Sequence, residues 1–191
     1  RLEYRGYDSA GVAILDGETL TIEKKEGKLQ VLKDHLADSK INGNIGIGHT
    51  RWATHGVPND VNAHPHSDNQ NEFAIIHNGI IENYAEMKDD LLKEGFKFES
   101  DTDTEVVAVE LGNQWTGRLL ETVTNVAKKL DGTYALVVTS TKEPGTIVAG
   151  RMMSPLVLGV GEGETFLASD SAAILEHTNK MIFLENGDFV E

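Results

Sequence analysis

The chain has 191 residues, no cysteine, and a formal net charge of −14 from 17 Lys and Arg against 31 Asp and Glu. At about 150 residues per domain, this length predicts one soluble globular domain. Without cysteine, the sequence excludes disulfides, thiolate zinc sites, iron–sulfur clusters and a cysteine nucleophile within these residues. The acidic balance argues against nucleic acid and anionic membranes as partners, since phosphate binding needs clustered Lys and Arg. No apolar run approaches the ~20 residues of a transmembrane helix.

The first quarter of the chain predicts a hairpin, a helix and a strand. Residues 10–24 form two apolar-rich runs that meet at Asp16-Gly17, a dipeptide that favours a tight hairpin turn. Leucines at helical spacing predict an amphipathic helix over 27–38. The sequence IGIGHT at 45–50 is typical of a strand.

A long polar segment and a group of helices are predicted next. Residues 51–71 are rich in turn-forming residues, and a connection of this length indicates either a functional loop or a flexible one. Residues 73–77 (FAIIH) predict a short strand that ends at Asn78-Gly79. Three helices should follow: one capped by Asn83 with Glu86 as the capping-box partner and ended by Gly95, one opened by Thr102 with Glu105, and one over 119–130.

From Thr133 onward the chain is rich in short apolar runs separated by Gly or Pro, which predict strands. The runs are YALVVTS, TIVAG, LVLGV, TFLASD, MIFLE and DFV. Strands thus come in two batches with the helices grouped between them. This order favours an α+β fold with antiparallel sheets over a doubly wound parallel sheet.

The densest polar cluster is HTRWATHG at 49–56. Arg51 could hold a carboxylate through two parallel hydrogen bonds, which a lysine cannot reproduce. Thr54 and His55 add donors and acceptors, and Trp52 offers a flat apolar lid over a small molecule. The alternative is structural: Trp52 anchors the loop to the core and Arg51 makes a surface ion pair.

Five of the seven histidines lie between His49 and His77, which raises the possibility of a metal site. His64-Pro65-His66 places two imidazoles two residues apart. No cysteine assists, no HExxH motif is present, and no carboxylate lies at a recognised ligand spacing, so we expect no metal and no other cofactor. A metal-dependent hydrolase using these histidines is kept as an alternative hypothesis, which metal analysis of the purified protein would test.

Two further clusters allow both a chemical and a structural interpretation. At His77-Asn78-Gly79, the Asn carboxamide and the Gly backbone N–H could hold an oxyanion formed in acyl transfer, or the pair could be a plain Asn-Gly turn. The acidic run 101–105 (DTDTE) is typical of a capped helix start, and one of its Asp residues could instead bind a ligand ammonium.

Taken in order, these clusters resemble one family. The motifs are RLEYRGYDSAG at 1–11, HTRWATHG at 49–56, NAHPH at 62–66, HNGIIEN at 77–83 and DTDTE at 101–105, with SPL, ASD and FLENGD further on. Their order is similar to that in the glutaminase domain, a type 2 glutamine amidotransferase domain, of glucosamine–fructose-6-phosphate aminotransferases. The resemblance covers nearly the whole chain.

The resemblance implies an N-terminal-nucleophile hydrolase fold, a four-layer αββα sandwich with two antiparallel sheets between helix layers. It also implies the chemistry. An N-terminal cysteine attacks the side-chain amide of glutamine with its own α-amine as the base, ammonia leaves, and water releases glutamate from the thioester. The ammonia then passes to a C-terminal sugar-phosphate isomerase domain of the same polypeptide, where fructose 6-phosphate becomes glucosamine 6-phosphate. A cytoplasmic homo-oligomer that binds neither nucleic acid nor membrane is the expected parent.

The resemblance also assigns roles to individual residues. Asn78 and Gly79 correspond to the oxyanion hole, Arg51 to the clamp on the glutamine α-carboxylate, and Asp103 to the residue near the α-ammonium. The remaining assignments are Thr54 and His55 as further substrate contacts, Trp52 as part of a loop over 51–59 that closes on glutamine, and Arg5 and Gly6 as residues near the nucleophile.

The chain departs from this family at the nucleophile, because it holds no cysteine and begins with Arg1. We therefore expect a single amidotransferase domain, 1–191, that is trimmed at its N-terminus, lacks the isomerase domain and is inactive as it stands. The competing hypothesis is a module that lost its nucleophile and only binds glutamine or regulates a partner.

Overall fold

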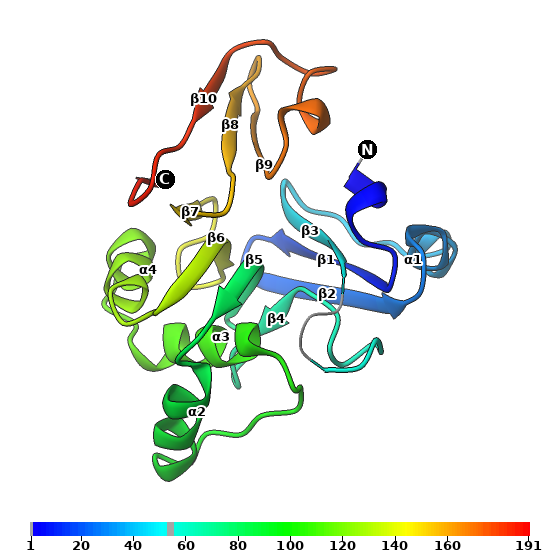
Figure 1. The fold of residues 1–191 in the computed structure, drawn as a ribbon. Helices are drawn as coiled ribbons and strands as arrows, with labels where there is room; N and C mark the ends of the chain where they lie inside the picture. The colour runs from blue at the N-terminus through cyan, green and yellow to red at the C-terminus, as the bar shows by residue number, and fades with distance from the viewer. Residues whose placement is uncertain (1, 53–55) are drawn as a thin grey trace.

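The computed structural model describes residues 2–52 and 56–191 (Figure 1). The helices are α1 (Leu29–Leu36), α2 (Tyr84–Lys93), α3 (Asp103–Asn113) and α4 (Leu119–Ala127), with 3-10 turns η1 (Leu2–Arg5) and η2 (Ser171–Ala173). The strands are β1 (Ser9–Asp16), β2 (Thr19–Glu26), β3 (Ile45–Arg51), β4 (His66–Ser67), β5 (Phe73–Ile81), β6 (Gly132–Ser140), β7 (Ile147–Met152), β8 (Val157–Val160), β9 (Thr165–Ala168), β10 (Met181–Phe183) and β11 (Phe189–Val190).

All strand pairs of the described residues are antiparallel, which confirms the predicted α+β class. The strand orders are β2-β1-β3, β11-β7-β6-β5-β4 and β10-β8-β9. In the described part of the chain the two expected sheets are thus divided into three. The third is the small C-terminal sheet in the upper part of Figure 1.

Alternation along the central strands separates two cores. On β5, Phe73 and Ile75 pack with helices α3 and α4, whereas Ala74 faces the opposite side and packs with Ala13 and Ile47 of the β2-β1-β3 sheet. Successive side chains of a strand point to opposite faces, so one strand serves both cores. The layers are therefore α2–α4, the five-stranded sheet, the β2-β1-β3 sheet, and α1 beyond it, in agreement with an αββα sandwich (Figure 1).

The predicted hairpin is confirmed: β1 and β2 pair from Ser9↔Glu26 to Asp16↔Thr19 around a two-residue turn at Gly17 and Glu18. Gly17 has φ +56°, a conformation that glycine adopts without steric cost. For the strand predicted over 73–77, the expected end at Asn78-Gly79 is wrong. Strand β5 continues to Ile81 because β6 pairs with its whole length, so an Asn-Gly turn is excluded.

Two predicted caps differ from their expected form. Helix α2 starts after Asn83 as predicted, but the Asn83 side chain bonds Lys129 and Asp131 and makes no cap. Helix α3 is capped by the Thr102 hydroxyl, which accepts from the Glu105 N–H at 3.3 Å. The Glu105 carboxylate turns to the backbone of residues 99 and 100 and so does not complete the box. Among the described residues, none of the helices has the length and apolar character needed to cross a membrane.

Candidate active site

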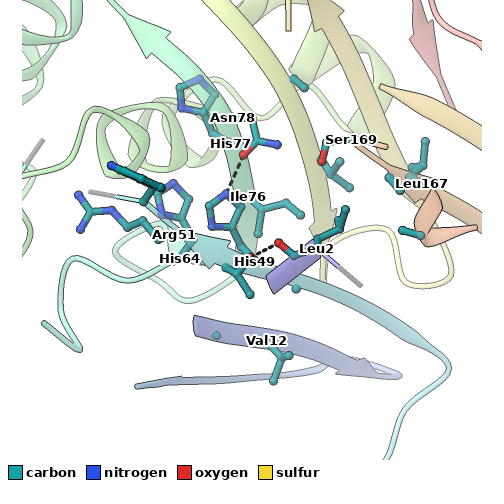
Figure 2. A pocket seen from close by; sticks show the side chains of 18 of the residues that line it. Leu2, Val12, His49, Arg51, His64, Ile76, His77, Asn78, Leu167 and Ser169 are labelled. Carbon is teal, nitrogen blue, oxygen red and sulfur yellow. Dashed lines mark hydrogen bonds between the residues drawn. The ribbon is translucent and has the colours of Figure 1, made fainter. Parts of the chain in front are cut away.

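A cavity of about 680 Å³ opens between the sheets and beside the C-terminal strands (Figure 2). Residues of β3, β5, the start of α3 and β9 contribute to its wall. The polar members that matter below are His49, Arg51, Trp52, His64, His77, Asn78, Gly79, Asp103, Thr104 and Ser169. The cavity therefore gathers residues from nearly the whole sequence, from Leu2 to His177.

Strand alternation explains how β5 contributes to this wall. His77 is buried and faces helix α3, where its Nδ1 lies 3.0 Å from the Thr104 hydroxyl. Asn78 points the other way, and its exposed carboxamide lines the cavity. Gly79 has φ +129°, and a Cβ at this position would run into the carbonyl oxygen of Thr133. Both residues of the predicted oxyanion hole thus lie in the cavity wall.

Arg51 ends β3 and is buried, with only 4% of its surface exposed. The structure therefore rules out the surface ion pair of the alternative interpretation. Burial lowers the pKa of the Arg51 guanidinium, whereas the carboxylates of Asp8 and Asp103 raise it. A buried cation on the cavity wall can recognise a carboxylate with two parallel hydrogen bonds.

Asp103 is the first residue of α3 and is also buried. Its Oδ2 accepts a hydrogen bond from the backbone N–H of Ile81 at 2.9 Å, and its Oδ1 accepts one from the Thr104 hydroxyl at 3.2 Å. These bonds hold the carboxylate at the end of β5, on the wall that also carries Arg51. A fixed carboxylate beside a fixed guanidinium can bind the two charged groups of an amino acid.

The remaining predicted residues are placed only in part. Trp52 is 58% exposed, lines the cavity, and packs edge-on against Tyr7 with ring centroids 5.4 Å apart, so it does not anchor the loop in the core. Thr54 and His55 lie outside the described residues. Arg5 ends η1, and nothing is described of its side chain.

Gly6 is buried against the end of β3 and does not line the cavity. A Cβ at Gly6 would lie 2.6 Å from the carbonyl oxygen of Thr50, so only glycine allows this close approach. The role of Gly6 near a nucleophile stays a prediction.

Four histidines cluster at the cavity wall, with His64, His66 and His77 buried and His49 partly exposed. His49 stacks on His64 with ring centroids 4.5 Å apart, and His64 meets His66 edge-on at 4.8 Å. Thr104 joins His64 to His77, with nitrogen-to-oxygen distances of 2.9 and 3.0 Å. Burial lowers the pKa of His49 to about 4 and the pKa values of His64 and His66 well below 6.5. These three rings are therefore neutral at neutral pH.

No group of three or more His, Asp or Glu side chains arranged to hold a metal ion occurs within residues 2–52 and 56–191. The clustered histidines instead stack on each other and bond hydroxyl and carboxamide groups.

Some cavity residues were not assigned any role from the sequence. His49 and Thr104 stand in quoted motifs, but only the structure shows that they contact Asn78 and Asp103. Ser169 belongs to the ASD motif and reaches the same cavity from the end of β9. No sequence spacing could have shown these contacts, because each joins different elements.

The neutral histidines predict an acid-sensitive fold. In the unfolded chain each histidine binds a proton near pH 6.5, whereas in the folded chain His49, His64 and His66 stay neutral to lower pH. The unfolded state then binds more protons, so the free energy of unfolding is highest above pH 6.5 and falls as the pH drops toward 4. Each histidine contributes up to about 1.4 kcal/mol per pH unit in this window.

Urea unfolding of the wild type and of the His66→Gln variant between pH 7.5 and 5 measures the slope of the unfolding free energy against pH. An equal slope in both would contradict this account.

A family model for the glutamine amidotransferase domain matches residues 23–188. The chain belongs to this family of glutamine amidotransferase domains. A solved structure of glutamine phosphoribosylpyrophosphate amidotransferase from B. subtilis, in complex with ADP and GMP, is similar with a TM-score of 0.82 and 28% identity. The match covers 98% of this chain and 41% of that one.

Two curated relatives carry the name glutamine–fructose-6-phosphate aminotransferase (isomerizing). The protein from Aquifex aeolicus is 52% identical over 191 residues, covering all of this chain and 32% of the relative. The protein from Thermococcus kodakarensis is 52% identical, covering 99% of this chain and 32% of the relative. The chain thus spans about a third of the length of these relatives.

Proposed function

We propose that this chain is the glutamine-binding part of an isomerising aminotransferase that takes ammonia from glutamine and delivers it to fructose 6-phosphate, forming glucosamine 6-phosphate. The single observation that carries the proposal is the gathering of Arg51, Asp103, Asn78 and Gly79 on the wall of one cavity. Relatives at 52% identity named for the same reaction support the choice of acceptor.

Each charged group of glutamine has a partner of opposite charge in the proposed complex. The buried guanidinium of Arg51 binds the α-carboxylate, and the carboxylate of Asp103 binds the α-ammonium. A zwitterionic amino acid held at these two points directs its side chain along the wall toward β5. The side-chain amide is then placed at Asn78 and Gly79.

The reaction at this amide is an acyl transfer. A thiolate forms a bond to the amide carbon, and the carbonyl oxygen becomes an oxyanion that accepts hydrogen bonds from the Asn78 carboxamide and the Gly79 N–H. The C–N bond breaks, the leaving nitrogen takes a proton and departs as ammonia, and water then converts the thioester to glutamate. Because residues 1–191 contain no cysteine, we propose that a cysteine outside them supplies the thiol in the full-length protein.

Further elements of the proposal concern the surroundings of the site. Trp52, on the cavity rim, belongs to a segment over 51–59 that closes on bound glutamine, with Thr54 and His55 as further contacts. Arg5 and Gly6 lie near the nucleophile. Residues 1–191 form one amidotransferase domain, and its partner is a sugar-phosphate isomerase domain of the same polypeptide in a cytoplasmic homo-oligomer.

Product analysis of the full-length protein tests the proposal. Incubation with glutamine and fructose 6-phosphate should give glutamate and glucosamine 6-phosphate in equal amounts. Glutamine binding without glutamate release would instead support the alternative, a glutamine-binding module that lacks a nucleophile. If the protein neither binds glutamine nor releases glutamate, both the proposal and its alternative are overturned.

A further inference from the structure

A hydrogen bond between strands β3 and β5 joins the histidine cluster to the carboxamide of Asn78. His49 lies on β3 and Asn78 on β5, and the Nε2 of His49 is 2.9 Å from the Oδ1 of Asn78 (Figure 2). Through this bond the histidine cluster contacts the carboxamide proposed to bind the oxyanion.

The direction of this bond follows from the chemistry of the two groups. The pKa of His49 is lowered to about 4 by burial, so the ring is neutral and carries one N–H. A carboxamide oxygen only accepts hydrogen bonds, so this N–H is on Nε2 and donates to Asn78. The carboxamide NH₂ of Asn78 then points away from His49, as Figure 2 shows.

The orientation of Asn78 matters because its carboxamide has two ends of opposite polarity. Rotation by 180° exchanges the NH₂ donor for an oxygen acceptor at nearly the same position. A donor aimed at the developing oxyanion stabilises it, whereas an oxygen in its place would repel it. Some group must therefore discriminate between the two rotamers of Asn78.

Stacking on a neighbouring histidine holds the His49 ring in place. Its ring stacks on His64 at 4.5 Å with an interplanar angle of 25°. His64 is in turn fixed by the Thr104 hydroxyl at 2.9 Å and by edge-on contact with His66. The histidine cluster thus connects the orientation of Asn78 to helix α3.

We propose that His49 is a positioning residue that selects the rotamer of Asn78 in which the NH₂ group faces the reacting amide. This inference rests on the proposed function and assigns His49 no contact with glutamine and no proton transfer. A ring that stays neutral acts through the direction of its N–H, not through charge.

Kinetics of glutamate release by the full-length protein test this role. His49→Phe keeps a ring for stacking and removes the N–H, and should lower kcat about 10- to 100-fold with the KM for glutamine changed less than about threefold. His49→Gln places an amide N–H near the Nε2 position and should recover most of the lost kcat. His35→Phe is the matched control, since His35 is on α1, bonds Glu23, and does not line the cavity.

A double-mutant cycle separates positioning from general loss of structure. In an Asn78→Ala background His49→Phe should cause no further loss of kcat, because the group it orients is gone. Should His49→Phe fail to fold, His49→Asn replaces it, as its shorter amide does not reach Asn78. Equal losses in both backgrounds, or no rescue by His49→Gln, would overturn the inference. A wild-type protein that releases no glutamate would instead overturn the proposed function.

Discussion

Replacing Asn78 by Ala in the full-length protein is expected to lower kcat for glutamate release by about 10²–10³. The side chain lines the cavity, and its NH₂ group is one of two proposed donors to the oxyanion. This interaction forms in the transition state, so the KM for glutamine should change little. Steady-state kinetics with glutamate detection measure both constants.

Asn69→Ala provides the control for Asn78→Ala. Asn69 is an exposed residue that bonds Lys97 far from the cavity, and its replacement should leave kcat unchanged. A loss below threefold for Asn78→Ala would contradict the oxyanion role. A raised KM with an unchanged kcat would show that Asn78 binds the ground state and the transition state alike.

The second large effect is expected at Arg51. Arg51→Lys keeps the positive charge near Asp8 and Asp103 but loses the planar pair of donors that fits a carboxylate. The KM for glutamine should rise about 10- to 100-fold, in line with the 1.5–3 kcal/mol of a hydrogen bond to a charged group. The midpoint of thermal unfolding should change little.

Arg51→Ala should raise KM at least as much and also destabilise the fold. Because Arg51 is buried near the carboxylates of Asp8 and Asp103, its removal takes away a positive charge that stabilises them. Arg118→Lys, at an exposed ion pair with Glu191, is the control and should change neither kcat nor the KM for glutamine. An unchanged KM in Arg51→Lys would exclude the carboxylate clamp.

Local sequence patterns predicted most of the elements because each element depends mainly on its own residues. The turn at Gly17 and the continuous apolar run of β6 are examples of such local signals. The Asn78-Gly79 pair was misleading because its local preference for a turn is overridden by pairing between strands. It favours a turn in isolation, yet pairing of Asn78 with Ala135 and of Gly79 with Tyr134 keeps it within β5.

The site was predicted to the extent that its residues stand in motifs that resemble a known family. Arg51, Asn78 and Asp103 were named in this way, and the structure places all three on one cavity wall. The role of His49 could not be predicted, because it depends on a contact between two sheets. The neutral state of His49 also depends on burial, which no spacing of histidines reveals.

A crystal structure of the full-length protein with glutamate, the product of the proposed hydrolysis, tests the central claim most directly. We predict that the α-carboxylate is bound by the Arg51 guanidinium, that the α-ammonium lies against Asp103, and that a side-chain carboxylate oxygen lies within hydrogen-bond distance of Asn78. Glutamate bound elsewhere, or bound in this cavity without contact to Arg51 and Asp103, would contradict the account.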